Sequence, residues 1–436
     1  MKTTTSGDVG GVSAIKGERQ VRNLFTAERQ LLLEDMLGEI PRHEFDFLNL
    51  VGEYAAKELW PFDKYRIIND PEYARERELQ PKEFGHEALK VVMAPLIDPN
   101  AIAVRGAFLP EKLGGHDISK PVYIMALEIL GQANASVSIS LAIDGSFLDT
   151  VASLGTEEQA RRYVTDAIER KKMAAFAQTE PGHGTDVANL EARASIKDEF
   201  FVLSGQKSLI TNGGWADYYF VVLRTGPNGK HGLSTIVVHG DEIPEIRQMK
   251  KETVRGSYTA ELFLDGARVP INDGVSRRIG ELDRGYVNAL KLLYGGRITI
   301  AALGLGIGQE ALDDAVHYAS CRIVGGQRII DFDAKSNELA ELKSNLAAAR
   351  SLTYQAANRW QHGKNILEIA SQAKLRATEA AFALAHANIW VHGGVGVTRD
   401  YRANHLADDV KVTIIGEGEN SVQRAILANL LKRQYK

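Results

Sequence analysis

The spacing of apolar residues changes twice along this chain, and no other feature of the sequence constrains the fold as much. From about residue 18 to 172, apolar residues recur every three or four positions, which is typical of amphipathic helices. From 173 to 279 the apolar runs are short, rich in β-branched and aromatic residues, and separated by Gly, Asn, Asp and Pro. From 280 to 436 long Ala- and Leu-rich helical patterns return. The sequence therefore predicts three domains in the order α, β, α.

The pattern of each domain also indicates a fold class. We expect an α+β protein with an N-terminal helical domain, a middle β-sandwich or barrel, and a C-terminal bundle of the four-helix type. The helices of the last domain are apolar on most sides, so we expect them to pack against other copies of the chain as well. Residues 1–17 are rich in Thr, Ser and Gly, and we expect a disordered tail there.

Composition excludes several classes of function. The net charge is −4 over 436 residues, which gives no electrostatic reason to expect binding to nucleic acid. Cys321 is the single cysteine and the eleven histidines contain no HExxH pair, so we expect neither a disulfide framework nor a metal site. No apolar run approaches the roughly 20 residues that span a bilayer, and the N-terminus does not resemble a signal peptide. We therefore expect a cytoplasmic protein without a membrane span.

Two glycine-containing segments suggest close approach of the backbone to another group. Residues 179–186, Thr-Glu-Pro-Gly-His-Gly-Thr-Asp, combine turn-forming residues with two hydroxyls and follow an apolar run at 174–177. Such a turn can cradle phosphate oxygens, with Thr179 and Thr185 as donors, although an ordinary surface loop has the same composition. Residues 304–308, Gly-Leu-Gly-Ile-Gly, lie in a helical pattern, so they predict close helix packing rather than a dinucleotide motif.

Seven motifs occur in a fixed order along the chain and together carry a family resemblance. They are Leu-Pro-Glu-Lys-Leu-Gly-Gly (109–115), Thr-Glu-Pro-Gly-His-Gly-Thr-Asp (179–186), Gly-Gln-Lys-Ser-Leu-Ile-Thr-Asn-Gly-Gly (205–214), Arg-Gly-Ser-Tyr-Thr-Ala-Glu-Leu (255–262), Tyr-Ala-Ser-Cys-Arg (318–322), His-Gly-Gly-Val-Gly (392–396) and Glu-Gly-Glu-Asn-Ser-Val-Gln-Arg (417–424). With these motifs the chain resembles the acyl-CoA dehydrogenase family from about residue 107 to the C-terminus. Residues before about 95 match poorly, and 53–59 and 73–79 are expected to belong to an N-terminal extension of this chain.

The resemblance implies that FAD binds between the β domain and the C-terminal helices. Thr211 corresponds to a threonine near flavin N5, and Arg322 to an arginine that reaches the FAD pyrophosphate of a neighbouring subunit. A guanidinium suits that role because its fixed fork can bind phosphate oxygens in pairs. The expected cofactor-binding residues are Phe176, Gln178, Thr179, Gly184, Thr185, Thr211, Arg322, Trp390, Gly393, Gly394 and Glu419.

Several of these positions depart from the family pattern or have a simpler explanation. Leu209 replaces an aromatic residue, Gly325 a phenylalanine, Trp390 a glutamine and Glu419 a threonine. Residues 211–214 could equally form a hairpin turn, and 392–396 a helix C-cap. Arg322 could be a solvated arginine at a helix end, and the carboxylates of the 417–424 motif could simply favour the start of a helix near residue 421.

The resemblance implies that Glu417 is the catalytic base. A glutamate at this position in the family abstracts the α-proton of an acyl-CoA thioester, and the β-hydrogen leaves as hydride to flavin N5, giving the trans-2-enoyl thioester. Proton abstraction of this kind needs a carboxylate whose pKa rises toward neutrality, which burial supplies. Some family members carry the base just before the position of Arg297 instead, and Gly296 occupies that place here. Thr185, Arg297 and Gly418 are expected to contact the substrate.

Three functions are compatible with the sequence. The first is an FAD-dependent acyl-CoA dehydrogenase of fatty acid β-oxidation that passes electrons to an electron-transferring flavoprotein and forms a homotetramer or dimer. The second is a flavin-dependent oxidase or monooxygenase on the same fold, which the departures at Leu209, Gly325 and Trp390 could permit. The third is a scaffold that has kept the fold and lost the flavin.

Overall fold

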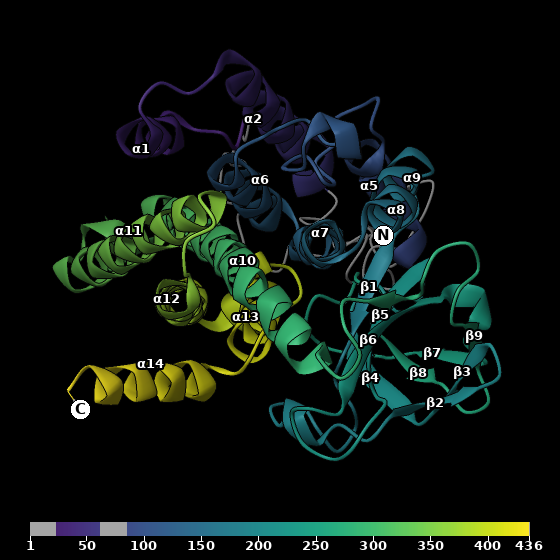
Figure 1. Ribbon diagram of the computed structural model, residues 1–436. Helices are drawn as coiled ribbons and strands as arrows, with labels where there is room; N and C mark the ends of the chain where they lie inside the picture. The colour runs from purple at the N-terminus through teal and green to yellow at the C-terminus, as the bar shows by residue number, and fades with distance from the viewer. Residues whose placement is uncertain (1–22, 62–84, 436) are drawn as a thin grey trace, which may run out of the picture.

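The computed structural model describes residues 23–61 and 85–435, arranged as a helical block, a β block and a second helical block (Figure 1). The α+β class predicted from the sequence is confirmed, including its order of helical, β and helical domains. The expected tail at 1–17 and the region 73–79 lie outside the described residues.

The N-terminal block is built around two helices that are buried on nearly all sides, α6 and α7. Asn134 separates them: it ends α6 in an extended conformation, and its side chain accepts a hydrogen bond from the Val137 amide at the start of α7. The elements of this block are α1 (Ala27–Leu37), α2 (Arg42–Tyr54), the π-helix η1 (Ala55–Leu59), α5 (Gly85–Ile97), η2 (Glu111–Leu113), α6 (Lys120–Ala133), α7 (Ala135–Leu154), α8 (Glu157–Ala160), η3 (Arg161–Thr165) and α9 (Asp166–Glu169).

The middle block contains two sheets with an apolar core between them. A seven-stranded sheet has the order β10-β6-β5-β2-β3-β9, with β1 pairing in parallel to β5, and a three-stranded sheet has the order β4-β8-β7. Central strand β5 is buried at all seven positions, as expected for a strand covered on both faces. The strands are β1 (Ala174–Ala177), β2 (Arg193–Lys197), β3 (Phe200–Ser204), β4 (Gln206–Ile210), β5 (Tyr218–Arg224), β6 (Leu233–His239), β7 (Glu245–Gln248), β8 (Ala260–Phe263), β9 (Arg268–Pro270) and β10 (Arg278–Ile279), with η4 (Val187–Asn189) and η5 (Gly240–Glu242) between them.

This topology corrects one alternative drawn from the sequence. The turn at 211–214 is not a hairpin, because β4 before it pairs with β8 while β5 after it lies in the larger sheet. The turn therefore carries the chain from one sheet to the other. Asn212 adopts φ 63° there, a left-handed conformation that Asn tolerates better than most residues.

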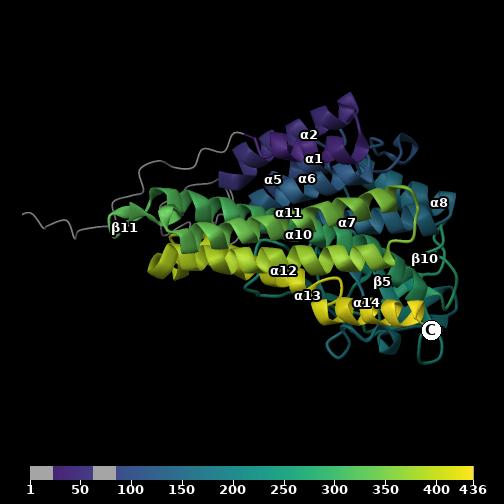
Figure 2. The same cartoon turned by 90° about the vertical axis from the view of Figure 1, so that its left-hand side faces the viewer.

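The C-terminal block is a bundle in which α10, α11 and α12 run side by side (Figure 2). Helix α10 is the centre of the molecule, because it packs against α6 and α7 of the first block as well as α11, α12 and α13. The elements are α10 (Gly285–Cys321), β11 (Ile323–Val324), β12 (Gln327–Arg328), η6 (Ile329–Asp331), α11 (Asp333–Gln361), α12 (Leu367–His392), η7 (Gly393–Val397), α13 (Arg402–Ile415) and α14 (Asn420–Gln434).

The glycines of α10 let neighbouring helices approach closely. A Cβ atom on Gly306 would lie 2.4 Å from the carbonyl oxygen of Glu128 and 2.6 Å from the amide nitrogen of Gln132, both on α6. A Cβ atom on Gly308 would lie 3.0 Å from the Cα of Ala381 on α12. These contacts are those of a close helix crossing and agree with the packing role predicted for residues 304–308.

Two helices are long and apolar enough to cross a membrane by length and composition, Ala135–Leu154 and Gly285–Cys321. In each, 78% of the most apolar window is buried inside the protein. Helices of this kind also form the cores of soluble proteins, and the burial explains the composition of α7 and α10 without a membrane.

We predict that Gly306→Ala destabilises the fold by about 1–3 kcal/mol, because the added methyl group would overlap the backbone of α6. Gly304→Ala is the matched control on the same helix, since a Cβ there would meet its nearest neighbour, the Cα of Thr378, at an ordinary 3.5 Å. Chemical unfolding of the two variants measures the difference. Equal stability of the two would show that α10 and α6 are not in close contact at Gly306.

Candidate functional site

Glu417 lies in the short segment between α13 and α14, with its side chain against α10. A Cβ atom on Gly296 would be 2.6 Å from Oε2 and 2.7 Å from Cδ of Glu417, so only a glycine leaves room for the carboxyl group. The backbone of Glu417 has φ 54° and that of Gly418 has φ 88°. A left-handed glutamate is uncommon, and such residues are concentrated at functional sites.

The residue Glu417 is partly exposed, but the Oε2 atom of its carboxyl group is buried and uncompensated: it makes no hydrogen bond within the described part of the chain. Burial raises the pKa of Glu417 to about 7, while the positive charges of Arg297 and Lys374 act in the opposite direction. A carboxyl group whose pKa lies near 7 can exchange protons at physiological pH.

Arg297 follows Gly296 on α10 and is also buried. Its Nε and Nη1 atoms have no hydrogen-bond partner among the described residues, and its guanidinium lies 5.4 Å from the ring centre of Tyr294. Burial lowers the pKa of Arg297, and the nearby Glu417 carboxylate partly offsets this. Buried donors and a buried carboxylate oxygen thus remain unsatisfied close together, which is typical of a ligand site.

Three residues that support this segment are absent from the sequence-based prediction. Lys374 on α12 and Gln423 on α14 donate to carbonyl oxygens of the segment around Glu417, and the Asn420 side chain on α14 accepts from Lys374. Asn420 and Gln423 belong to the 417–424 motif, whereas Lys374 lies outside it, in a stretch of α12 that also contains Gln372, Arg376 and Glu379. No sequence signal singles out Lys374, because a lysine among other polar residues on a helix is ordinarily exposed.

The expected cofactor residues of the β block surround the end of β1. Phe176 is in β1, and Gln178 follows it with Oε1 buried and without a partner within the described residues. The Thr179 carbonyl accepts a hydrogen bond from the Ser208 amide of β4. Asn212, next to Thr211, donates to the carbonyl oxygens of Ser140 and Ala174 and so connects the turn to α7 and β1. A buried acceptor without a donor fits a bound group with N–H donors, such as a flavin ring.

A buried ion pair holds this part of the β block in place. Lys207 donates to Glu180 Oε1 at 2.7 Å and to the Gln178 carbonyl at 3.0 Å. Burial lowers the pKa of Lys207 to about 8. Glu180 also accepts from the amides of Glu191 and Ala192, so its charge is well compensated. Neither Lys207 nor Glu180 was predicted as a site residue, although both lie in the motifs.

The turn at 180–183 is closed by its own backbone, since the amides of Glu180 and His183 each donate to the other's carbonyl oxygen. Those two amides therefore donate within the turn rather than to a ligand. A Cβ atom on Gly184, which precedes Thr185, would meet nothing within 4 Å, so the backbone there is open to approach.

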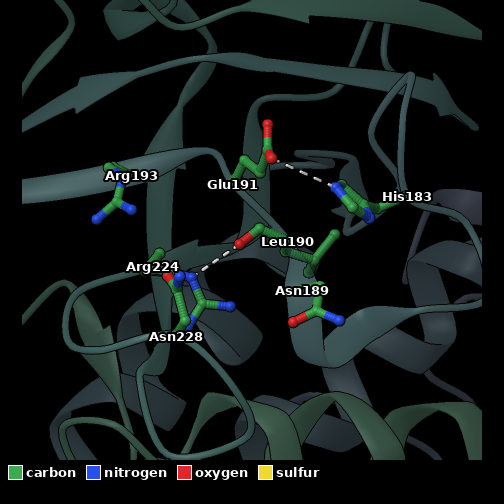
Figure 3. A pocket seen from close by; sticks show the side chains of 7 residues that line it. All are labelled: His183, Asn189, Leu190, Glu191, Arg193, Arg224 and Asn228. Carbon is green, nitrogen blue, oxygen red and sulfur yellow. Dashed lines mark hydrogen bonds and ion pairs between the residues drawn. The ribbon is translucent and has the colours of Figure 1, made fainter.

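A polar cavity of about 490 Å³ lies beside this turn (Figure 3). His183 and Glu191 form an ion pair at 3.7 Å across it. Arg224 is already satisfied, because it donates to the carbonyl oxygens of Leu190, Ala188, Pro227 and Gly229. Arg193 is exposed. The residues that line the cavity are His183, Asn189, Leu190, Glu191, Arg193, Arg224 and Asn228.

The remaining expected cofactor residues lie far from Glu417 within one chain. Arg322 directly follows α10, and its distance from Gly296 along the helix axis is about 39 Å at 1.5 Å per residue. Trp390 is 62% exposed and lies about 24 Å along α12 from Lys374. Gly393, with φ 63°, ends α12 as the predicted C-cap, and Gly394 follows it in η7. One chain therefore does not bring all the predicted cofactor residues together.

The two glutamates of the last motif have different surroundings. The Glu419 side chain is the N-cap of α14 and accepts a hydrogen bond from the Ser421 amide at 2.9 Å. Hydrogen bonds from Ser421 lower the pKa of Glu419. The helix-start explanation considered for both glutamates thus applies to Glu419 and not to the buried carboxyl of Glu417.

Comparison with known proteins identifies the family. Three family models match in chain order: the acyl-CoA dehydrogenase N-terminal domain at residues 101–171, the middle domain at 175–267 and the C-terminal domain at 283–432. The chain belongs to the acyl-CoA dehydrogenase family. Acyl-CoA dehydrogenases are FAD-dependent flavoproteins and oxidoreductases that act on CH–CH bonds.

Individual relatives cover most of both chains. An acyl-CoA dehydrogenase of Bacillus subtilis is 36% identical over 75% of this chain and 86% of its own length. The short-chain specific acyl-CoA dehydrogenase of Megasphaera elsdenii is 33% identical over 89% of this chain and 97% of its own. The solved structure of butyryl-CoA dehydrogenase from Megasphaera elsdenii has a TM-score of 0.80 at 31% identity, over 90% of this chain and 99% of that one.

We predict that Glu417→Gln increases the stability of the ligand-free protein at pH 8 more than at pH 5. The folded state holds the Glu417 proton more tightly than the unfolded state, because burial raises its pKa from 4.5 to about 7. The wild type therefore loses folding free energy as pH rises from 4.5 to about 7, which the neutral glutamine avoids, and the expected gain between the two pH values is roughly 2 kcal/mol. Chemical unfolding at both pH values measures it, and an equal effect at both would contradict a raised pKa.

Proposed function

We propose that this protein catalyses the α,β-dehydrogenation of an acyl-CoA thioester to the trans-2-enoyl thioester, with Glu417 removing the α-proton. The observation that carries the proposal is the buried Glu417 carboxyl group, whose Oε2 has no hydrogen-bond partner among the described residues and whose pKa burial raises to about 7. A base near neutrality combines a large ionised fraction with a strong tendency to accept a proton.

The surrounding residues support that role. Gly296 leaves room for the Glu417 carboxyl group against α10, and Glu417 itself has a left-handed backbone. Arg297 adds a buried positive charge with unpaired donors, which can stabilise negative charge on a substrate oxygen. Gln178, Thr179 and Thr211 would hold the flavin from the β block. When bound, FAD supplies the acceptor for the hydride that leaves the β-carbon.

The atoms and electrons of the proposed reaction balance with Glu417 and a bound FAD, together with the substrate and water. The proton from the α-carbon goes to Glu417, and the electron pair of that C–H bond forms the new C=C bond. When bound, FAD would accept the hydride of the β-carbon with its two electrons, which balances the oxidation of the substrate. Glu417 then returns its proton to water once the product has left.

The proposal includes assembly into an oligomer. Arg322, Trp390, Gly393 and Gly394 lie too far from Glu417 to complete the same site in one chain, so we place them at the flavin of a neighbouring copy in a dimer or homotetramer. The mass from light scattering would then be two or four times the 47.8 kDa of one chain.

The electron acceptor and the cellular setting are also part of the proposal. We place the enzyme in the cytoplasm and in fatty acid β-oxidation, with an electron-transferring flavoprotein as acceptor. One relative is the caffeyl-CoA reductase–Etf complex subunit CarC of Acetobacterium woodii, 30% identical over 76% of this chain and 87% of its own. That relative is a subunit of a complex with an electron-transferring flavoprotein, which supports the proposed acceptor. Failure of an added electron-transferring flavoprotein to reoxidise the reduced enzyme would count against that acceptor.

We predict that Glu417→Gln keeps the visible flavin band and loses at least about a hundredfold in enoyl-CoA formation, because the amide cannot accept the α-proton. The measurement is an anaerobic titration of the purified holoprotein with acyl-CoA thioesters of different chain lengths, following flavin bleaching and enoyl product. Glu419→Gln is the comparison variant, since that carboxylate caps α14 and is not buried beside α10.

Other outcomes of this titration separate the competing functions. If Glu417→Gln retains most of the turnover and Glu419→Gln does not, Glu419 is the base. A flavin band in the wild type that no thioester bleaches, together with rapid reoxidation by oxygen once reduced, would favour an oxidase or monooxygenase. Absence of a flavin band even after addition of FAD would favour the third function, a scaffold that has lost the flavin.

A further inference from the structure

We propose that Lys374 is a positioning residue for Glu417: by bridging the two ends of the 414–420 segment, it holds the Glu417 carboxyl group against Gly296 of α10. This inference deepens the proposed function and rests on Glu417 as the base. It assigns a role to a side chain on α12, which lies outside the seven motifs and outside the segment between α13 and α14 that contains Glu417.

The geometry around Lys374 is that of a bridge. Its Nζ donates to the carbonyl oxygen of Ile414 at 2.6 Å and to that of Gly418 at 3.0 Å. A third bond runs to Asn420 Oδ1 at 2.7 Å. The first acceptor precedes Glu417 in the chain and the other two follow it, so a single ammonium group joins both sides of the segment. All three ammonium protons find oxygen acceptors.

The segment needs such support because its conformation is unfavourable. A left-handed φ of 54° at Glu417 places its Cβ close to backbone atoms, and nothing in the intrinsic preference of glutamate maintains it. Gln423 adds a second hold, since its Nε2 donates to the Gly418 carbonyl at 2.7 Å and to the Glu417 carbonyl at 3.3 Å. Thr378, one turn after Lys374 on α12, is hydrogen-bonded to the Asn420 side chain.

Lys374 also acts on the Glu417 carboxyl group through its charge. It is fully buried, and the charged groups that act on it are Glu417, Glu419, Glu379 and Arg297. Burial lowers the pKa of Lys374 to about 7, while its three oxygen acceptors favour the charged ammonium form. The positive charge in turn lowers the pKa of Glu417. Loss of Lys374 therefore has two effects that can be separated, one on geometry and one on protonation.

The experiment compares the wild-type holoprotein with Lys374→Met, which keeps the length of the side chain and removes both its donors and its charge. We expect kcat to fall at least about tenfold, with KM within about threefold, because the base is displaced while the rest of the substrate site is intact. The acid limb of the kcat–pH profile should move to higher pH, because Glu417 loses a neighbouring positive charge. The flavin band should be unchanged.

Two further variants distinguish positioning from charge and from general destabilisation. Gln423→Leu removes the hydrogen bonds from Gln423 to the Gly418 and Glu417 carbonyl oxygens without changing the charge. We therefore expect kcat to fall while the acid limb of the kcat–pH profile stays in place. Lys251→Met removes a partly buried lysine that also donates to a loop carbonyl, that of Val254, and should leave kcat and the pH profile unchanged. If Lys374→Met yields no folded holoprotein, Lys374→Arg is measured instead, with lower kcat and an unmoved acid limb expected.

A second readout does not depend on turnover. Difference infrared titration of the carboxyl C=O band, assigned with Glu417→Gln, reports the pKa of Glu417 directly, and that pKa should be higher in Lys374→Met than in the wild type. Wild-type kcat and an unshifted Glu417 titration in Lys374→Met, with Glu417→Gln inactive, would overturn the inference and leave the proposed function standing. Full turnover in Glu417→Gln would instead remove the proposed function itself.

Discussion

The close contacts made at the glycines of α10 are the constraint on which the rest of the structure depends. At Gly306 the missing side chain lets the α6 backbone come within 2.4 Å of the position a Cβ would take, and at Gly308 it lets α12 approach. At Gly296 the same absence leaves room for the Glu417 carboxyl group instead of a helix. The helix that holds the three blocks together therefore also forms one wall of the candidate site. The position of the Glu417 carboxyl group consequently depends on the packing of the core around α10.

Burial shifts the pKa values of the charged residues in the site and also costs folding free energy. Glu417, Arg297 and Lys374 are charged groups placed where water is largely excluded, and the pKa of each is displaced in the direction that favours its neutral form. Lys374 is compensated by three oxygen acceptors, whereas atoms of Glu417 and Arg297 lack partners among the described residues. Lys374, which holds the segment, is thus the residue whose charge is compensated by hydrogen bonds. The groups without partners are those proposed to act on the substrate.

Much of the fold could be predicted from the sequence, because a change from helical to strand spacing is visible in a single chain. The role of Glu417 could be proposed only from its motif, since its burial depends on Gly296, which is distant in sequence. Lys374 was missed because a lysine on a helix ordinarily points to solvent, and only the structure shows its three acceptors. The hairpin alternative at 211–214 failed because strand pairing is a long-range property: β4 pairs with β8, about 50 residues later.

The most direct test of the account is the rate of flavin bleaching by a good acyl-CoA substrate, measured anaerobically by stopped flow between pH 5.5 and 9. If the buried Glu417 carboxyl group is the base, the second-order rate at low substrate concentration, which reports the free enzyme, should rise about tenfold per pH unit at low pH and level off above a pKa near 7. At saturating substrate the rise should shift to higher pH, because bound substrate excludes more water from the carboxyl group. A rate that is independent of pH, or that falls as pH rises through 7, would contradict the account.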